Sequence, residues 1–135
     1  MKYRISASIG KDKYKTEITN DRNSIIADEP EDLGGEDLGL APFELVLSSL
    51  AACKAITMRM YADRKEWPLE EVKLEMDLEV QKTSGQETTY INANIELIGD
   101  LDEEQKARII KIADKCPTHK LLQNPIVINS TLIQK

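Results

Sequence analysis

The sequence predicts an α+β fold with antiparallel sheets around a long buried central helix, in the order β-β-β-α-β-β-α-β. Three observations predict it: short alternating segments precede residue 28, a long apolar helix-forming stretch starts at Pro42, and two alternating segments follow Pro68. With 135 residues and 41% hydrophobic content, the chain can bury one sizeable core. We therefore expect a single domain spanning residues 1–135.

The N-terminal segment predicts an antiparallel meander of three strands. Residues 2–9 and 13–18 alternate around a turn at Gly10, and a short third strand covers residues 23–27. The stretch 28–40 is rich in glycine and acidic residues and therefore predicts a loop.

The central helix is predicted to begin at Pro42, which suits a first helical position, and to end before Pro68. Its first half, to about Ile56, is apolar on nearly every face, which predicts burial on more than one side. The second half carries charges such as Arg59 and Asp63 and is expected to reach water. So apolar a helix, with a modest sheet to cover it, favours a dimer.

Two further strands and a second helix are predicted after Pro68. Residues 72–80 and 88–99 alternate with period two and form a hairpin through a link that contains Gly85. Asp102 is a plausible N-cap for the second helix, which has acidic residues in its first turn.

The C-terminal part is predicted to contain one more strand. The second helix is expected to run to Cys116, because Pro117 stops it. Residues 126–133 then alternate irregularly and predict a final strand.

Composition excludes several classes of function. The 18 basic and 24 acidic residues give a net charge of -6, so nothing favours nucleic acid or an anionic membrane as a partner. The first 17 residues lack the apolar core of a signal peptide, and no stretch resembles a charge-free membrane span. We expect a cytoplasmic protein, in which two cysteines are free or transiently paired.

Cys53 lies in the middle of the predicted central helix, where the helix dipole has faded. Its helical face is predicted to be apolar, and such a lining raises the pKa of a thiol. A reactive Cys53 therefore needs a cation from another segment or another chain, and otherwise it is a small core residue. The residues on this face are Val46, Leu50, Thr57 and Met60.

Cys116 follows the second helix, in an accessible position that suits either a resolving thiol or a residue of the helix cap. It lies too far from Cys53 in sequence for a C-x-x-C redox pair, and two cysteines with one histidine fall short of a zinc site. His119 is either a solvated residue near a helix end or a base or hydrogen-bond donor beside Cys116.

Two segments carry a resemblance to a known family. GGEDLGLAPFELVLSSLAACKAITMRMYADRKEWPLE (34–70) and ADKCPTHKLL (113–122) resemble the OsmC/Ohr family, in a match that covers nearly the whole chain. The glycine-rich loop, the helix that starts at proline and carries small-small-Cys, and the distant Cys-Pro pair are specific together, although each is weak alone.

The resemblance implies an intertwined homodimer with active sites at the subunit interface, where Cys53 is the peroxidatic and Cys116 the resolving cysteine. Such proteins reduce organic hydroperoxides, and some also reduce hydrogen peroxide. A Cys53 sulfenic acid forms and is captured as a Cys53–Cys116 disulfide. A dithiol such as dihydrolipoamide restores the enzyme, without metal or flavin.

The resemblance also implies an arginine that stabilises the thiolate and a glutamate that positions this arginine. Arg22 is our candidate, Arg4 is a second one, and Arg22 as a solvated turn residue is an equal alternative. Glu44 is the candidate glutamate, but Phe43 occupies the family's position directly after Pro42. A shift of one residue rotates the side chain by about 100°, and the sequence therefore resembles the OsmC-like branch.

Three functional hypotheses follow. The leading one is a cysteine-based peroxidase that acts on hydroperoxides in oxidative stress defence. The alternative is a non-catalytic OsmC-like module that binds a hydrophobic or thiol ligand. A third hypothesis makes both thiols structural and gives the dimer an interaction role.

Overall fold

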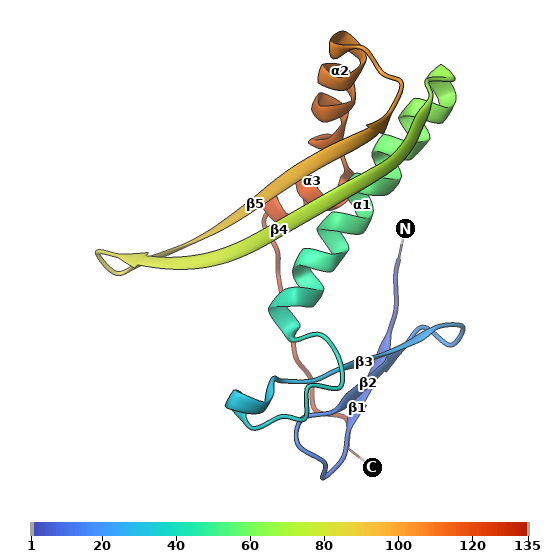
Figure 1. Ribbon diagram of the computed structural model, residues 1–135. Helices are drawn as coiled ribbons and strands as arrows, with labels where there is room; N and C mark the ends of the chain where they lie inside the picture. The colour runs from blue at the N-terminus through green and yellow to red at the C-terminus, as the bar shows by residue number, and fades with distance from the viewer. Residues whose placement is uncertain (1, 135) are drawn as a thin grey trace. The chain divides into compact units, whose positions relative to one another are not determined.

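The computed structural model describes residues 2–134, with elements in the order β1, β2, β3, η1, α1, β4, β5, α2, α3 (Figure 1). The chain forms two compact units, Met1–Ser48 and Ser49–Lys135. The α+β class with antiparallel sheets is confirmed, as is the predicted element order up to the second helix. The expectation of one domain across residues 1–135 stays a prediction.

The first unit contains the predicted meander. The strands β1 (Ser6–Ile9), β2 (Thr16–Thr19) and β3 (Ser24–Ala27) form an antiparallel sheet in sequence order. Each has four residues, so β1 and β2 are shorter than the alternating segments that predicted them.

The loop after β3 is ordered around a buried carboxylate, which the sequence pattern did not indicate. Asp28 accepts hydrogen bonds from the backbone N–H groups of Glu29 (2.7 Å) and Leu38 (3.2 Å). Burial alone raises the pKa of Asp28, but these and two further backbone N–H groups bring that pKa below its ordinary value. Gly39 lies so close to the Ile26 carbonyl that a Cβ atom would clash with it. The loop also contains the short helix η1 (Glu31–Leu33).

Helix α1 (Pro42–Lys65) begins at the predicted proline. In its first turn Glu44 Oε1 accepts a hydrogen bond from the Ala41 N–H at 2.8 Å, which satisfies one of the free donors at the helix start. The helix ends two residues earlier than expected, because Glu66 adopts a left-handed conformation with φ of 59°.

Burial along α1 differs from the prediction. The buried residues follow one stripe with a spacing of three or four: Leu50, Lys54, Met58, Tyr61 and Ala62. The expectation that the first half is buried on more than one side is therefore wrong, since Phe43 is 64% exposed. The charged residues of the second half reach water as expected, since Asp63 is exposed. The opposite face of this half is buried, because Met58 and Ala62 pack into the core of the second unit.

The second unit contains a long antiparallel hairpin of β4 (Leu69–Thr83) and β5 (Gln86–Gly99). Ser84 and Gly85 connect the strands with φ values of 51° and 79°, which is the conformation of a type I′ turn. The predicted hairpin is confirmed, and it is longer than expected because residues of the predicted link pair as strand.

One face of the hairpin is apolar and covers the core of this unit. Cross-strand pairs such as Leu74 with Ile95 point to the same side. With Val72 and Leu97 they pack against a buried cluster on α1, the start of β4, α2 and the loop before α2, whose members are Met58, Tyr61, Ala62, Leu69, Leu101, Ile109 and Ala113. The distal part of the hairpin extends beyond the helices (Figure 1).

Helix α2 (Glu103–Ala113) begins as predicted. Asp102 accepts from the Gln105 N–H at 2.8 Å, and the Gln105 side chain accepts from the Asp102 N–H at 3.0 Å, which completes a capping box. The helix ends at Ala113, three residues before the predicted end.

The C-terminal prediction is wrong in two respects. Pro117 does not follow a helix but begins one, α3 (Pro117–Gln123), for which Cys116 is the N-cap. The predicted strand at residues 126–133 is absent, since residues 125–134 have no regular secondary structure. A strand needs a hydrogen-bonded neighbour, and none of the strands within residues 2–134 pairs with this segment.

Candidate active site

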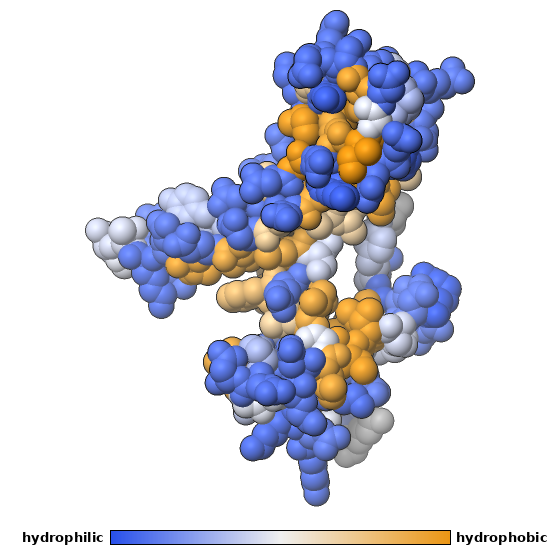
Figure 2. Space-filling view, viewed as in Figure 1, coloured by the Kyte–Doolittle hydropathy of each residue, from blue (hydrophilic) through white to orange (hydrophobic). Residues whose placement is uncertain are grey.

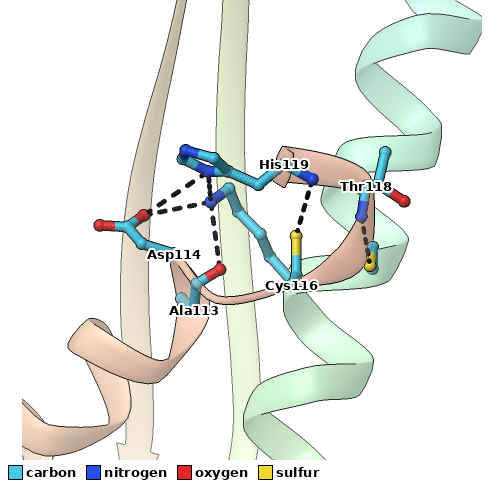
Figure 3. Close-up of polar contacts among 7 residues, drawn as sticks. Ala113, Asp114, Cys116, Thr118 and His119 are labelled. Atoms are coloured by element: carbon cyan, nitrogen blue, oxygen red, sulfur yellow. Dashed lines mark hydrogen bonds and ion pairs between the residues drawn. The ribbon is translucent and has the colours of Figure 1, made fainter. Parts of the chain in front are cut away.

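The structure brings Cys53 and Cys116 together within the second unit. Cys53 lies on α1 and is half-buried, whereas Cys116 lies in the turn between α2 and α3 and is fully buried. The first turn of α3 serves both sulfurs: the Thr118 N–H donates to Cys53 Sγ and the His119 N–H to Cys116 Sγ, each at 3.4 Å (Figure 3). Both thiols are free.

The surroundings of Cys53 favour its thiolate. Burial alone raises the pKa of Cys53, but hydrogen bonds lower it below the ordinary thiol value. The donors are the hydroxyl and backbone N–H of Thr118, the Cys116 thiol and the Thr57 hydroxyl. Burial raises this pKa as expected, but polar donors on α1 and α3, which the sequence did not indicate, also reach the sulfur. The cation from another segment or chain stays a prediction.

The pKa of Cys116 is shifted in the opposite direction. Burial raises the pKa of Cys116, and the neighbouring Cys53 raises it further, while the His119 N–H and the Lys54 charge act against them. The expectation of an accessible, mobile Cys116 is also wrong, since the start of α3 encloses it. Within the pair, the pKa of Cys53 is thus shifted toward the thiolate and that of Cys116 toward the thiol.

A buried cation, Lys54, lies beside the two cysteines and was not predicted from the sequence. Lys54, which is 4% exposed, donates to the Ala113 carbonyl and to Asp114 Oδ1, both at 3.2 Å. Its Nζ also lies 3.1 Å from His119 Nδ1. The signal was present, because Lys54 is the only charged residue between Glu44 and Arg59 in a helix of otherwise small and apolar residues.

His119 only partly fits each of its two predicted roles, which were a solvated residue near a helix end and a base or hydrogen-bond donor beside Cys116. Its side chain is about one-third exposed, and it points toward Lys54 and Asp114 rather than toward a thiol (Figure 3). The hydrogen bond to Cys116 comes from its backbone N–H. The prediction of a donor beside Cys116 therefore holds for the backbone of His119, not for its ring.

The two candidate arginines belong to the first unit. Arg22 is exposed in the turn between β2 and β3, where its backbone N–H donates to Asn20 Oδ1 at 3.0 Å. Arg4 lines the same hollow at this end of the sheet as Arg22. The role of either arginine as the cation beside Cys53 stays a prediction.

Glu44 also belongs to the first unit, and its carboxylate caps the start of α1 through the Ala41 N–H. This contact gives Glu44 a structural role that its sequence position did not indicate. Its predicted role in positioning an arginine stays a prediction.

The lowered pKa of Cys53 predicts how its alkylation depends on pH. Because the thiolate is the reactive form, the rate with iodoacetamide should rise and level off at a lower pH than for an ordinary thiol. Thr118→Val removes a hydroxyl donor and should move this midpoint to higher pH, whereas Thr118→Ser retains the donor and should not. Mass spectrometry of the modified residue measures both, and equal midpoints for the Val and Ser variants would contradict the role of the hydroxyl.

Two neighbouring thiols, one with a lowered and one with a raised pKa, define the class of a two-cysteine thiol protein, suited to nucleophilic and redox chemistry. The model of the OsmC family, described as OsmC-like protein, matches residues 34–131. The chain belongs to this family. No curated protein matches the sequence.

Solved structures of the family share the fold. An OsmC-like protein from Mycoplasma pneumoniae has 25% identity and a TM-score of 0.77, with 91% of this chain and 88% of that chain covered. An organic hydroperoxide resistance protein OsmC from Legionella pneumophila has 20% identity, a TM-score of 0.68 and coverage of 91% and 90%. The organic hydroperoxide resistance protein OhrB of Bacillus subtilis has 18% identity, a TM-score of 0.64 and 91% coverage of both chains.

Family membership also explains the apolar character of α1. By length and a mean hydropathy of 1.2, this helix alone would suffice to cross a membrane. The OsmC-like fold is a soluble domain, and α1 is its central helix.

Proposed function

We propose that this protein is a thiol peroxidase that reduces organic hydroperoxides, and hydrogen peroxide as a second substrate, in oxidative stress defence. The observation that carries the proposal is the placement of both thiols at the first turn of α3, whose N–H groups donate to Cys53 Sγ and Cys116 Sγ at 3.4 Å. The lowered pKa of Cys53 and the raised pKa of Cys116 agree with it. Family membership and the resemblance to organic hydroperoxide resistance proteins support it.

In the first step the Cys53 thiolate attacks an oxygen of the hydroperoxide. The O–O bond breaks, the alkoxide leaves and takes up a proton to become an alcohol, and Cys53 becomes a sulfenic acid. The sulfur loses the two electrons that reduce the peroxide. The hydrogen bonds from Thr118 and Thr57 then stabilise the attacking thiolate.

In the second step the Cys116 sulfur attacks the oxidised Cys53. An S–S bond forms, the S–O bond breaks, and the hydroxide that leaves combines with the thiol proton to give water. A dithiol such as dihydrolipoamide reduces the disulfide and becomes a cyclic disulfide itself. We further propose that Arg22 and Glu44 assist at Cys53, as the family resemblance implies.

We propose that the active form is a homodimer. Large apolar side chains are exposed on α1, on the distal hairpin and in the C-terminal segment. Figure 2 shows apolar surface along the hairpin. The exposed apolar residues include Phe43, Ile56, Met60, Val80, Tyr90, Ile126, Val127, Ile128, Leu132 and Ile133. A second copy that covers them would remove this surface from water. A monomer in analytical ultracentrifugation would contradict the dimer.

We also propose that residues 1–135 act as one OsmC-like domain in the cytoplasm, where the thiols are kept reduced between turnovers. Fractionation of cells is the test of this location.

The test of the function is peroxide consumption by the reduced protein with dihydrolipoamide. Cumene or tert-butyl hydroperoxide should be lost catalytically and faster than hydrogen peroxide. Oxidation that stops at stoichiometric amounts would contradict the proposal.

Peroxide oxidation that stops at stoichiometric amounts would instead favour a module that binds a hydrophobic or thiol ligand. The observation in favour of this second function is Phe43, which is exposed where the family has its glutamate. A binder would retain its ligand after both cysteines are changed to serine.

A further inference from the structure

Lys54 is a buried cation whose contacts all lie on the segment that carries Cys116. Its Nζ reaches the Ala113 carbonyl and Asp114 Oδ1, which precede Cys116 in sequence, and His119 Nδ1, which follows it. Figure 3 shows Asp114 and His119 converging on one side of the turn that holds Cys116. The turn is therefore fixed on both sides of the cysteine.

The three contacts match the hydrogen-bonding capacity of an ammonium group, which has three donors and no acceptor. Because an ammonium group can only donate, His119 Nδ1 is the acceptor in its contact with Lys54. No donor of the Lys54 ammonium is left without a partner, so the buried charge is compensated. Asp114, whose side chain is 70% exposed, supplies the formal negative charge of the pair.

Lys54 directly follows Cys53 on α1, so neighbouring residues of one helix contact the same turn. The Cys53 sulfur accepts from Thr118, and the Lys54 ammonium binds the two flanks of that turn. A rigid helix thereby sets the position of the Cys116 sulfur relative to the Cys53 sulfur. Displacement of a reacting group by about 1 Å is enough to slow a reaction by about a hundredfold.

We propose that Lys54 is a positioning residue for disulfide formation: it holds the turn of Cys116 in place, so that the Cys116 sulfur attacks Cys53 once Cys53 carries a leaving group. This role deepens the proposed function and rests on it for its place in peroxide reduction. In the reaction the Cys116 sulfur forms the S–S bond, the leaving group departs from Cys53, and the Cys116 proton goes to the leaving group or to solvent.

The charge of Lys54 has a second effect on disulfide formation. The titratable and charged groups that face Cys116 are Cys53 and Lys54 from α1, Asp114 from the end of α2 and His119 from α3. The Lys54 charge lowers the pKa of Cys116, whereas burial and Cys53 raise it. Loss of the Lys54 charge should therefore shift disulfide formation to higher pH.

Reaction with dithiobis(nitrobenzoate) distinguishes the reactivities of the two thiols in one experiment. The accessible Cys53 thiolate attacks the reagent, breaks its S–S bond and releases one thionitrobenzoate, which leaves a mixed disulfide on Cys53. Cys116 then attacks this mixed disulfide, releases the second thionitrobenzoate and forms the Cys53–Cys116 bond. The first phase reports on Cys53 and the second on Cys116.

We expect Lys54→Met, which retains the apolar stem, to leave the first phase unchanged at a pH where that phase has levelled off, because Cys53 is then deprotonated in both proteins. The second phase should slow by about 10- to 100-fold, and its pH midpoint should rise. Lys115→Met is the matched control, because Lys115 is an exposed lysine next to Cys116, and it should leave both phases unchanged. Equal second phases and equal midpoints in folded Lys54→Met and wild type would overturn the role.

Asp114→Ala and His119→Ala test the same role if Lys54→Met does not fold, because each leaves Lys54 in place and removes one tether. Each should slow the second phase, and wild-type second phases in both would overturn the proposal. The reagent needs no peroxide. Two normal phases without peroxide consumption would therefore refute the peroxidase function alone, whereas peroxide consumption with an unaltered second phase in Lys54→Met would refute the role of Lys54 alone.

Discussion

We expect Cys53→Ser to abolish the consumption of organic hydroperoxides. A serine hydroxyl is a far weaker acid than a thiol and cannot form a sulfenic acid, so the first chemical step has no nucleophile. The loss should exceed about a thousandfold, as is typical when a nucleophile is removed. Consumption of cumene hydroperoxide in the presence of dihydrolipoamide measures it.

Ala52→Ser is the matched control, because it adds the same hydroxyl to the adjacent, exposed position of α1. This variant should turn over at the wild-type rate. Full turnover by Cys53→Ser would rule out Cys53 as the nucleophile, and the peroxidase hypothesis would lose its central residue.

The second large effect is expected for Cys116→Ser. Serine retains a hydroxyl that can donate to the Cys53 sulfur, so the first oxidation of Cys53 should proceed. The disulfide cannot form, so sulfenic acid accumulates, and excess peroxide oxidises it further to sulfinic acid. Without reductant, mass spectrometry should detect a dimedone adduct on Cys53 in this variant and a disulfide in the wild type.

Cys116→Ala separates the two contributions of Cys116. It also prevents the disulfide, but it removes the hydrogen bond to Cys53, so the pKa of Cys53 should rise and its first oxidation should slow at neutral pH. A disulfide-free wild type after oxidation, or an absence of sulfenic acid in Cys116→Ser, would show that Cys116 does not resolve Cys53.

Local patterns predicted most elements of the fold, because hydrophobic periodicity, proline and capping residues act over a few residues. Pro42 marked the start of α1, and Asp102 marked the start of α2. The strand at residues 126–133 and the burial of the first half of α1 were predicted wrongly, because both depend on which surfaces meet in space. Helix α3 was missed because it is short and because its first residue, Pro117, also fits a position after the end of a helix.

The sequence by itself determined the family, the position of Cys53 on the central helix and the presence of a second thiol before Pro117. Only the tertiary structure decided what surrounds them: the backbone of α3 donates to both sulfurs, and Lys54 turns inward to bind the flanks of Cys116. The physical reason is that a thiol pKa depends on burial and on donors within a few ångströms. Thr118, which donates to Cys53, and His119, which contacts Lys54, each lie 65 positions from their partner in sequence, and no local pattern encodes that meeting.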